Sequence, residues 1–270
     1  MSWKIAACMQ INEESLKMLS EVGIRGIEIP GALQLNPFKV SREELKRIRE
    51  LSKSYNVDIV ASNVIYPSDF SHASNDELIR RKSIEYTYKI AEAASEVDCP
   101  ILVWGSGKAR NIPPEVPLEK GYERNLQVLK EAAKAGKEFN TTFAVEPLPR
   151  NETNFVNKIE EAVKLIESVG SDFVKVMADV RHMMREEADV EESIRLAREK
   201  IVHVHLADNN SKVPGMGIIN FSKLFRVFKE INYKGAMSIE ARLGENSKEE
   251  LKFALKTLKE ATKEVDSTLI

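Results

Sequence analysis

Residues 173–208 read FVKVMADVRHMMREEADVEESIRLAREKIVHVHLAD. Two short apolar runs rich in β-branched residues, 173–180 and 201–208, enclose a longer charged segment. Apolar runs of this length indicate buried strands, and two strands joined by a long amphipathic connection are typical of parallel pairing. This stretch therefore predicts an α/β fold with a parallel sheet.

The same alternation continues along the whole chain. Eight apolar runs are predicted strands: 3–9, 23–30, 57–64, 99–106, 141–148, 173–180, 201–208 and 235–241. The segments between them are amphipathic, as in SREELKRIRELSKSY (41–55), where Leu45, Ile48 and Leu51 share one stripe of a helix. Eight such units in 270 residues match the repeat of a single (β/α)₈ barrel. A doubly wound open sheet is the alternative, but MQINEES follows the first strand in place of a glycine-rich dinucleotide fingerprint.

Composition narrows the classes of function. No linker-like or low-complexity stretch divides the chain, so residues 1–270 are predicted to form one barrel domain. A net charge of −2 and a pI near 6.2 give no reason to expect a nucleic-acid partner. Without a leader-like start or an apolar run of roughly 18 residues, we expect a cytoplasmic protein without membrane association. Cys8 and Cys99 lie in apolar segments and are predicted to be reduced core residues.

Strand alternation predicts which side chains face the barrel interior. In the run 201–208 one face carries Ile201, His203 and His205, and the other carries Val202, Val204 and Leu206. The aliphatic face is expected to pack under the helices, which leaves both histidines inside. His205 lies nearer the C-terminal mouth, where barrels of this class carry their chemistry.

Three carboxylates occupy equivalent positions on other strands. The same alternation places Glu146, Asp179 and Glu240 on the inner face at the ends of their strands. Carboxylates gathered in a cavity repel one another unless a cation neutralises them. Oxygen ligands with one imidazole suit Mn²⁺, Mg²⁺ or Co²⁺. We therefore predict a metal site formed by Glu146, Asp179, His205 and Glu240, with Mn²⁺ as the first choice of cation.

These residues lie in segments that resemble the xylose isomerase-like barrel superfamily, and within it the sugar isomerase/epimerase branch with the tagatose and psicose (allulose) 3-epimerases. The matching segments are VEPLPRNE (145–152), ADVRHM (178–183), HVHLADNN (203–210), PGMG (214–217) and SIEAR (238–242). The resemblance implies the four metal ligands named above, with Glu146 and Glu240 also transferring protons. It further implies that Glu152 and His182 contact the sugar substrate, and that the protein forms a homo-oligomer, a dimer or a tetramer.

The reaction expected from this resemblance is C3 epimerisation of a free ketose through a metal-stabilised cis-enediolate, with the two glutamates as acid and base. Three alternatives stay open. An aldose–ketose isomerase and an inosose-type isomerase or dehydratase use a similar metal site. A nuclease of the apurinic-endonuclease type shares the barrel and the DxxH element at Asp179 and His182.

One position departs from the epimerase pattern. Epimerases of this type place an Arg that contacts the substrate six residues after the metal-binding His. Here that position is Ser211, and Lys212 follows it. Lys212 is therefore a candidate substrate-binding residue, although an ammonium does not reproduce a guanidinium fork.

The sequence also supports predictions for four other side chains. Glu28 is expected to reach substrate hydroxyls or to pair with an Arg or Lys. Trp104 is expected to stack on the sugar or to cover the core. His203 is predicted to support His205 from one layer below. His72 is predicted to be a solvated loop residue before a helix.

Overall fold

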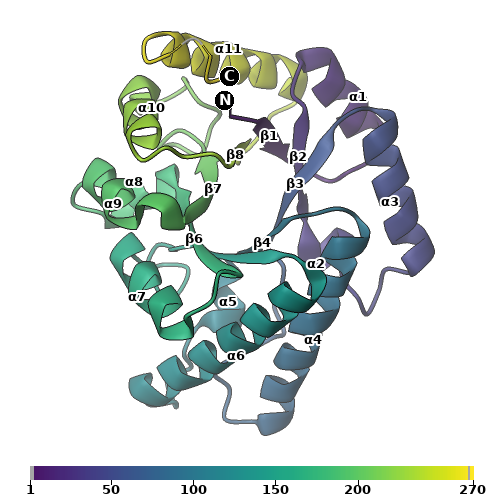
Figure 1. The fold of residues 1–270 in the computed structure, drawn as a ribbon, viewed down its shortest axis with the longest axis vertical. Helices are drawn as coiled ribbons and strands as arrows, with labels where there is room; N and C mark the ends of the chain where they lie inside the picture. Colours follow the sequence, from purple (N-terminus) through teal and green to yellow (C-terminus); the bar gives the residue numbers. More distant parts are fainter. Residues whose placement is uncertain (1–2, 267) are drawn as a thin grey trace.

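The computed structural model describes residues 3–266 and 268–270, and its strands form one closed barrel (Figure 1). The strands are β1 Ile5–Cys8, β2 Gly26–Pro30, β3 Asp58–Asn63, β4 Ile101–Trp104, β5 Thr142–Val145, β6 Val174–Asp179, β7 Ile201–Leu206 and β8 Ala236–Ile239. Each strand pairs in parallel with its neighbours in sequence, and β8 pairs in parallel with β1. The prediction of a (β/α)₈ barrel is confirmed, and an open sheet is excluded.

Helices surround the barrel and connect its strands (Figure 1). They are α1 Glu13–Val22, α2 Gly31–Gln34, α3 Arg42–Ser54, α4 Glu77–Glu96, α5 Gly107–Arg110, α6 Leu118–Phe139, α7 Ile159–Val169, α8 Val180–Glu186, α9 Val190–Ala197, the 3₁₀ turn η1 Arg198–Lys200, α10 Phe221–Glu230 and α11 Ser247–Lys263. Side chains fix where several of them begin. Asn12 and Ser15 form a capping box at the start of α1, and Asn220 accepts a hydrogen bond from the Lys223 backbone N–H at the start of α10.

The alternation of β7 is interrupted near its start. The register between β6 and β7 shifts between the pairs Val176–Ile201 and Met177–His203, so Val202 is an extra residue on β7. Ile201 therefore packs in the main core under the helices, while Val202 packs against the interior residues Val103, Ala144 and Met177. The predicted directions of Ile201 and Val202 are wrong because a period of two does not survive a bulge.

The barrel interior is filled by two kinds of layer. Small and medium apolar side chains fill the lower part: Ala6, Val60, Ala61, Val103, Ala144 and Met177. Toward the C-terminal ends of the strands the buried interior side chains become polar: Glu28, Glu146, Asp179, His203, His205 and Ser238. Each group in a charged layer with almost no exposure to water needs a hydrogen-bonding or charged partner. This polar layer is therefore the candidate functional site of the barrel.

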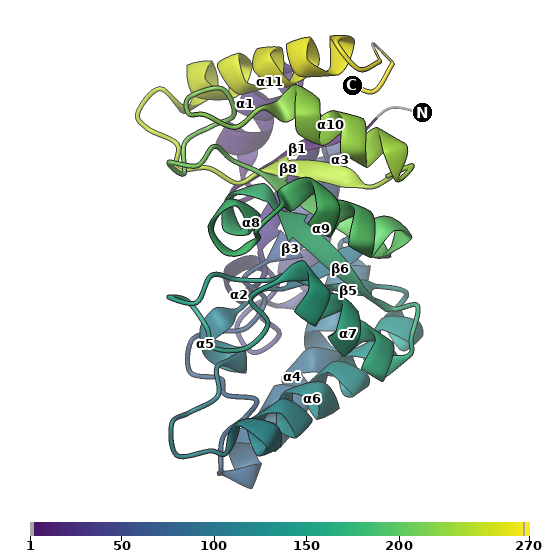
Figure 2. The ribbon, with the colours of Figure 1, turned by 90° about the vertical axis from the view of Figure 1, so that its left-hand side faces the viewer.

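The connections after the strands distinguish the two ends of the barrel. In Figure 2 the short helices α5 and α8 lie on the left, and both chain termini lie on the right. Because α5 and α8 follow β4 and β6, the left side is the C-terminal mouth. Among the described residues, no helix is long and apolar enough to cross a membrane.

Candidate metal centre

The four predicted metal ligands lie together at the barrel mouth. One ligand atom each from Glu146, Asp179, His205 and Glu240 can be chosen so that all lie within 4.8 Å of one another. His205 Nδ1 lies 3.7 Å from Glu146 Oε1, 3.7 Å from Asp179 Oδ2 and 3.3 Å from Glu240 Oε2. The side chains come from or directly follow β5, β6, β7 and β8, as strand alternation predicts.

This donor set fits a divalent cation. Ligand atoms about 2.1 Å from one cation lie roughly 3.0–3.4 Å from each other, close to the distances around His205 Nδ1. Asp179 Oδ2 and His205 Nδ1 are buried, and neither has a hydrogen-bond partner in the part of the chain that the structure describes. Buried polar atoms without partners are rare in proteins. Three carboxylates and one imidazole converge here, and these residues would hold a hard or borderline cation.

Asp179 is positioned by the helix that it begins. It is the last residue of β6 and the N-cap of α8, and its Oδ1 accepts a hydrogen bond of 2.9 Å from the His182 backbone N–H. Only Oδ2 is then left to face the other ligands. The short sequence ADVRHM thus fixes the direction of the Asp179 carboxylate and places His182 beside it.

Glu146 depends on a glycine and a buried arginine of the neighbouring β4 connection. A Cβ atom on Gly105 would lie 1.8 Å from Glu146 Oε2, so only glycine leaves room for this carboxylate. Arg110 is fully buried and donates to the Trp104 carbonyl at 3.0 Å and to the Glu146 carbonyl at 2.5 Å. These two bonds tie the ends of β4 and β5 together.

Glu240 is held by two residues that the sequence analysis missed. Asn63 Nδ2, at the end of β3, donates to Glu240 Oε1 at 3.2 Å. Arg181 Nη2 donates to Glu240 Oε2 at 3.4 Å and lies 3.5 Å from Asp179 Oδ2. The same alternation that selects Glu146 selects Asn63 as an inward-facing strand end. Arg181 stands two residues after the predicted ligand Asp179, and this proximity in sequence could have identified it as a site residue.

Glu28 supports the imidazoles and is turned away from the mouth. It is fully buried, with Oε2 2.7 Å from His203 Nε2 and Oε1 2.9 Å from His205 Nε2. Neither an exposed carboxylate for substrate hydroxyls nor a pairing with Arg or Lys is observed, because both oxygens are used by histidines. His203, which also contacts the Ser238 hydroxyl at 3.2 Å, occupies the supporting layer that the sequence predicts.

The predicted substrate residues differ in how close they lie to the centre. His182 is buried, and its Nδ1 is 3.4 Å from both Glu146 Oε1 and Asp179 Oδ2. Glu152 is more exposed, with its Oε1 4.0 Å from His182 Nε2. Lys212 is exposed on the connection that follows β7. His182 and Glu152 therefore form a line from the centre to the rim, whereas Lys212 lies on the surface of the loop.

Trp104 and His72 pack together outside the barrel. Trp104 pairs in register with Val145, whose side chain belongs to the main core, and its indole is 1% exposed. It therefore covers the core, and the alternative of stacking on a sugar does not match its position. His72 is also 1% exposed and stacks on Trp104 with ring centroids 5.4 Å apart. The prediction of a solvated His72 is wrong, and burial lowers the pKa of this imidazole to about 3.

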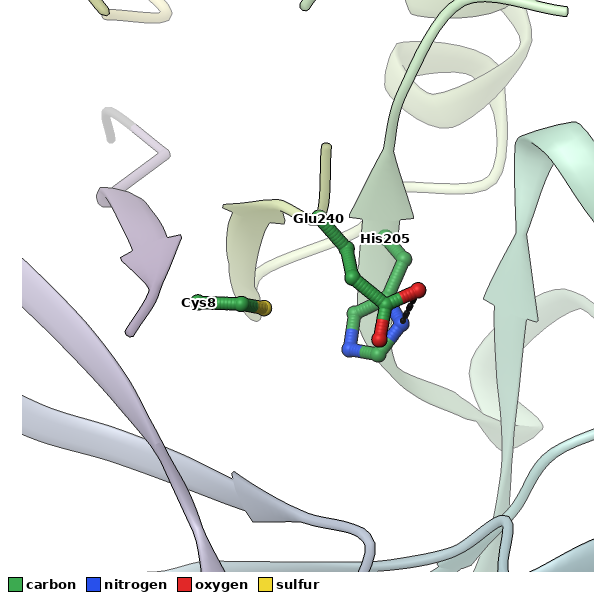
Figure 3. A group of neighbouring side chains, drawn as sticks. All are labelled: Cys8, His205 and Glu240. Atoms are coloured by element: carbon green, nitrogen blue, oxygen red, sulfur yellow. Dashed lines mark ion pairs between the residues drawn. The ribbon is translucent and has the colours of Figure 1, made fainter. Parts of the chain in front are cut away.

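Cys8 lies at the mouth, while Cys99 lies in the core. Cys8 is the last residue of β1, and Figure 3 shows its side chain directed toward His205 and Glu240. The prediction that Cys8 is a core residue is wrong, because it is half-buried at the rim. Cys99 is buried and donates to the Ile101 carbonyl, so its predicted core position is confirmed.

Burial and neighbouring charges shift the pKa values of the predicted ligands. Burial raises the pKa of the Glu146 carboxyl. Burial acts in the same direction on Asp179, but His182, His205 and Arg181 outweigh it and hold the Asp179 pKa below its ordinary value. Burial disfavours the protonated imidazole of His205, yet Glu28 and Glu240 raise its pKa well above the ordinary value. Protons on Glu146 and His205 therefore compete with a cation for the same lone pairs.

Asp208 fixes the loop that follows β7. Its side chain is fully buried and accepts backbone hydrogen bonds from Asn209 at 3.0 Å, Gly215 at 3.0 Å and Ile219 at 3.1 Å. A Cβ atom on Gly217 would lie 2.2 Å from Asp208 Oδ1, so the loop closes tightly around this carboxylate. One side chain thus replaces the regular backbone hydrogen bonds that a loop lacks.

We expect Asp208→Ala to lower the free energy of unfolding by about 1–3 kcal/mol, because the loop N–H groups lose their acceptor. Urea unfolding measures this change, and limited proteolysis between residues 209 and 219 reports the loop directly. Asp172→Ala is the matched control, since its side chain is 96% exposed, and should stay within about 0.5 kcal/mol of the parent protein. Equal unfolding midpoints for the two variants would contradict the role assigned to Asp208.

Comparisons with known proteins agree with the barrel fold. Residues 16–261 match the model of a family described as Xylose isomerase-like TIM barrel. A D-psicose 3-epimerase of Enterocloster bolteae is 27% identical over 82% of this chain and 74% of its own length. A 3-dehydro-D-guloside 4-epimerase of Escherichia coli strain K12 is 26% identical over 85% of this chain and 87% of its own length. The solved D-psicose 3-epimerase of Clostridium cellulolyticum H10, crystallised with D-tagatose, superposes with a TM-score of 0.82 at 20% identity and covers 98% of this chain and 99% of its own, a similarity of fold.

Proposed function

The chain belongs to the xylose isomerase-like TIM barrel family, and from this premise we propose that it is a divalent-metal-dependent sugar epimerase that inverts C3 of a free ketose. Curated relatives are named as epimerases, which are isomerase-class enzymes. One observation carries the proposal. Oxygens of Glu146, Asp179 and Glu240 converge on Nδ1 of the buried His205, an atom without a hydrogen-bond partner among the residues that the structure describes. We propose Mn²⁺ as the cation, with Mg²⁺ or Co²⁺ as alternatives.

Epimerisation requires removal of a proton from one face of a carbon and delivery of a proton to the other face. Glu146 and Glu240 reach the centre from β5 and from the end of β8, so we assign one face of the substrate carbon to each. A cation bound by the four ligands would supply Lewis-acid stabilisation of the negative charge that develops on the substrate oxygens. Burial raises the pKa of Glu146, a shift in the direction that suits a carboxyl that both accepts and returns a proton.

The neighbours of the two glutamates give them different surroundings. Asn63 and Arg181 hold the oxygens of Glu240 by hydrogen bonds, while His182 Nδ1 lies 3.4 Å from Glu146 Oε1. These contacts favour one orientation of each carboxylate, and such positioning accounts for a large share of catalysis in enzymes.

Arg181 supplies the guanidinium that position 211 lacks. Ser211 has a φ of 64°, and its carbonyl accepts a hydrogen bond of 2.8 Å from the Arg242 backbone N–H, so it serves the loop. Arg181 reaches into the centre with a side chain that is 15% exposed, whereas Lys212 is exposed on the loop. We therefore assign the substrate-oxygen contact to Arg181 in preference to Lys212, together with His182 and Glu152.

The test is incubation of the manganese-loaded protein with a panel of free ketoses in deuterated water. We expect deuterium at C3 of at least one ketose together with its C3 epimer, detected by proton NMR and mass spectrometry. Label at C1 or C2 with formation of an aldose would replace the proposal with an aldose–ketose isomerase. Label at C4 would assign the reaction to the position named for the Escherichia coli relative.

Two other results would reject the proposal outright. Loss of water from an inosose would indicate the dehydratase alternative. Cleavage of abasic DNA at low protein concentration would indicate the nuclease alternative, and the mixed charge of the chain, −2 overall, makes a DNA-binding face unexpected.

A further inference from the structure

A second group of ligand-type atoms overlaps the metal centre on the side of β1. The Cys8 Sγ, one nitrogen of His205 and one oxygen of Glu240 lie within 4.8 Å of one another. In Figure 3 the Cys8 side chain points toward the other two, and Glu240 lies over the His205 ring. We propose that Cys8, His205 and Glu240 form a binding site for a thiophilic divalent cation such as Zn²⁺, in competition with the cation of the four-ligand centre.

The chemistry of the two donor sets differs. The four-ligand centre offers three carboxylates and one imidazole, a set for hard or borderline cations. The overlapping group replaces two carboxylates with one sulfur. One sulfur, one imidazole and one carboxylate are all ligands that Zn²⁺ accepts, with water in a fourth tetrahedral position. A thiolate raises the preference for soft and borderline cations, so the two positions select different metals.

The backbone already places these donors next to each other. The strands β1 and β8 pair directly, with Ala7 opposite Ile239, so the following residues Cys8 and Glu240 leave adjacent strands at the same level. In a tetrahedral zinc site the ligand atoms lie about 3.4–3.6 Å apart. Donors that lie within 4.8 Å of one another therefore need to approach by at most about 1.4 Å. The Glu240 side chain is 26% exposed and Cys8 is half-buried, which gives both room to rotate.

The two positions share His205 and Glu240 and therefore exclude each other. His205 Nδ1 lies 3.3 Å from Glu240 Oε2, whereas Nε2, the ring nitrogen on the side of Cys8 in Figure 3, is hydrogen-bonded to Glu28 Oε1 at 2.9 Å. A cation beside Cys8 therefore has to displace Glu28 from His205 and to draw Glu240 away from the four-ligand centre. When a cation draws both residues toward Cys8, only Glu146 and Asp179 remain as ligands of the four-ligand centre. Formation of the Sγ–metal bond breaks the Sγ–H bond and releases that proton to solvent.

Cadmium titration with ultraviolet absorption tests the site without any turnover, because a cadmium–thiolate bond has its own charge-transfer band. The chain has two cysteines, so Cys99→Ser is the matched control for Cys8→Ser. We expect the band in the parent protein and in Cys99→Ser, and its loss in Cys8→Ser with a Cd²⁺ affinity at least about tenfold weaker. Cys8→Ala replaces Cys8→Ser if circular dichroism shows that the serine variant does not fold.

Competition with Mn²⁺ tests the sharing of ligands. Excess Mn²⁺ should reduce the cadmium–thiolate band of the parent protein, and Mn²⁺ should still bind to Cys8→Ser, as measured by electron paramagnetic resonance. A band that persists in both Cys8 variants, or that is absent from the parent protein and Cys99→Ser, would overturn the site. A band that excess Mn²⁺ leaves unchanged would overturn the competition. The proposal uses the same side chains as the proposed epimerase but requires no reaction, so the two stand or fall by separate experiments.

Discussion

Glu146→Gln and Glu240→Gln are each expected to lower kcat for C3 epimerisation by about 10²- to 10⁴-fold. Glutamine keeps the length and one carbonyl oxygen of the side chain but accepts no proton. The neighbours of each position remain, since Asn63 and Arg181 hold residue 240 and His182 lies against residue 146. Steady-state kinetics with the ketose identified in the labelling panel measures the loss.

Deuterium exchange separates the two glutamates from each other. If each serves one face of the carbon, the remaining carboxylate still exchanges the C3 hydrogen of the epimer whose hydrogen faces it. We therefore expect Glu146→Gln to wash deuterium into one epimer and Glu240→Gln into the other, with almost no conversion between them. Proton NMR of each pure epimer in deuterated water detects this.

Glu119→Gln is the matched control, because Glu119 is exposed on α6 and should retain the turnover of the parent protein. Mn²⁺ affinity is measured for all three variants, since Glu146 and Glu240 are also assigned as ligands. A Glu146 or Glu240 variant that binds Mn²⁺ and keeps near-parental turnover would remove that residue from the proton-transfer pair.

Gly105→Ala is the second large effect that we expect. The added methyl group would lie 1.8 Å from Glu146 Oε2 and 3.0 Å from its carboxyl carbon, so the carboxylate must rotate away. Glu146 is 5% exposed and has little space to move. A displacement of about 1 Å at a catalytic group costs on the order of 10² in rate, and we expect a loss of this size in kcat together with weaker Mn²⁺ binding.

The matched control for this substitution is Gly244→Ala, where the nearest atom to the new methyl group is the end of the Glu250 side chain at 3.0 Å. Both variants should unfold within a few degrees of the parent protein in a thermal scan. Gly105→Ala would then lose activity with an intact fold. Full activity of Gly105→Ala would show that Glu146 reaches its catalytic position by another route.

Strand alternation recovers most of the centre from sequence because parallel strands end at one edge. The four predicted ligands each face inward at or just after the end of a strand: Glu146, Asp179, His205 and Glu240. Residues at these positions meet at the barrel mouth independently of the loop conformations. The fold is equally accessible, since eight strand–helix units leave few topologies.

What the sequence does not reveal depends on neighbours distant in the chain. The outward turn of Ile201 follows from a bulge against β6, which no pattern within β7 encodes. His72 is buried because Trp104 lies beneath it, and a polar segment gives no sign of that contact. The partners of Glu28 lie 175 and 177 residues away, and only the closed barrel brings them together.

The bridge from Glu28 to both imidazoles has a consequence for protein engineering. Replacing His205 with an oxygen ligand would leave Glu28 with one imidazole donor, His203, in a layer that is fully buried. A buried carboxylate that loses one of its two partners is costly, so the gain at the mouth would be offset by a loss in the layer below. A library that aims to change the metal preference should therefore vary positions 28, 203 and 205 as one block, because single substitutions there would be epistatic.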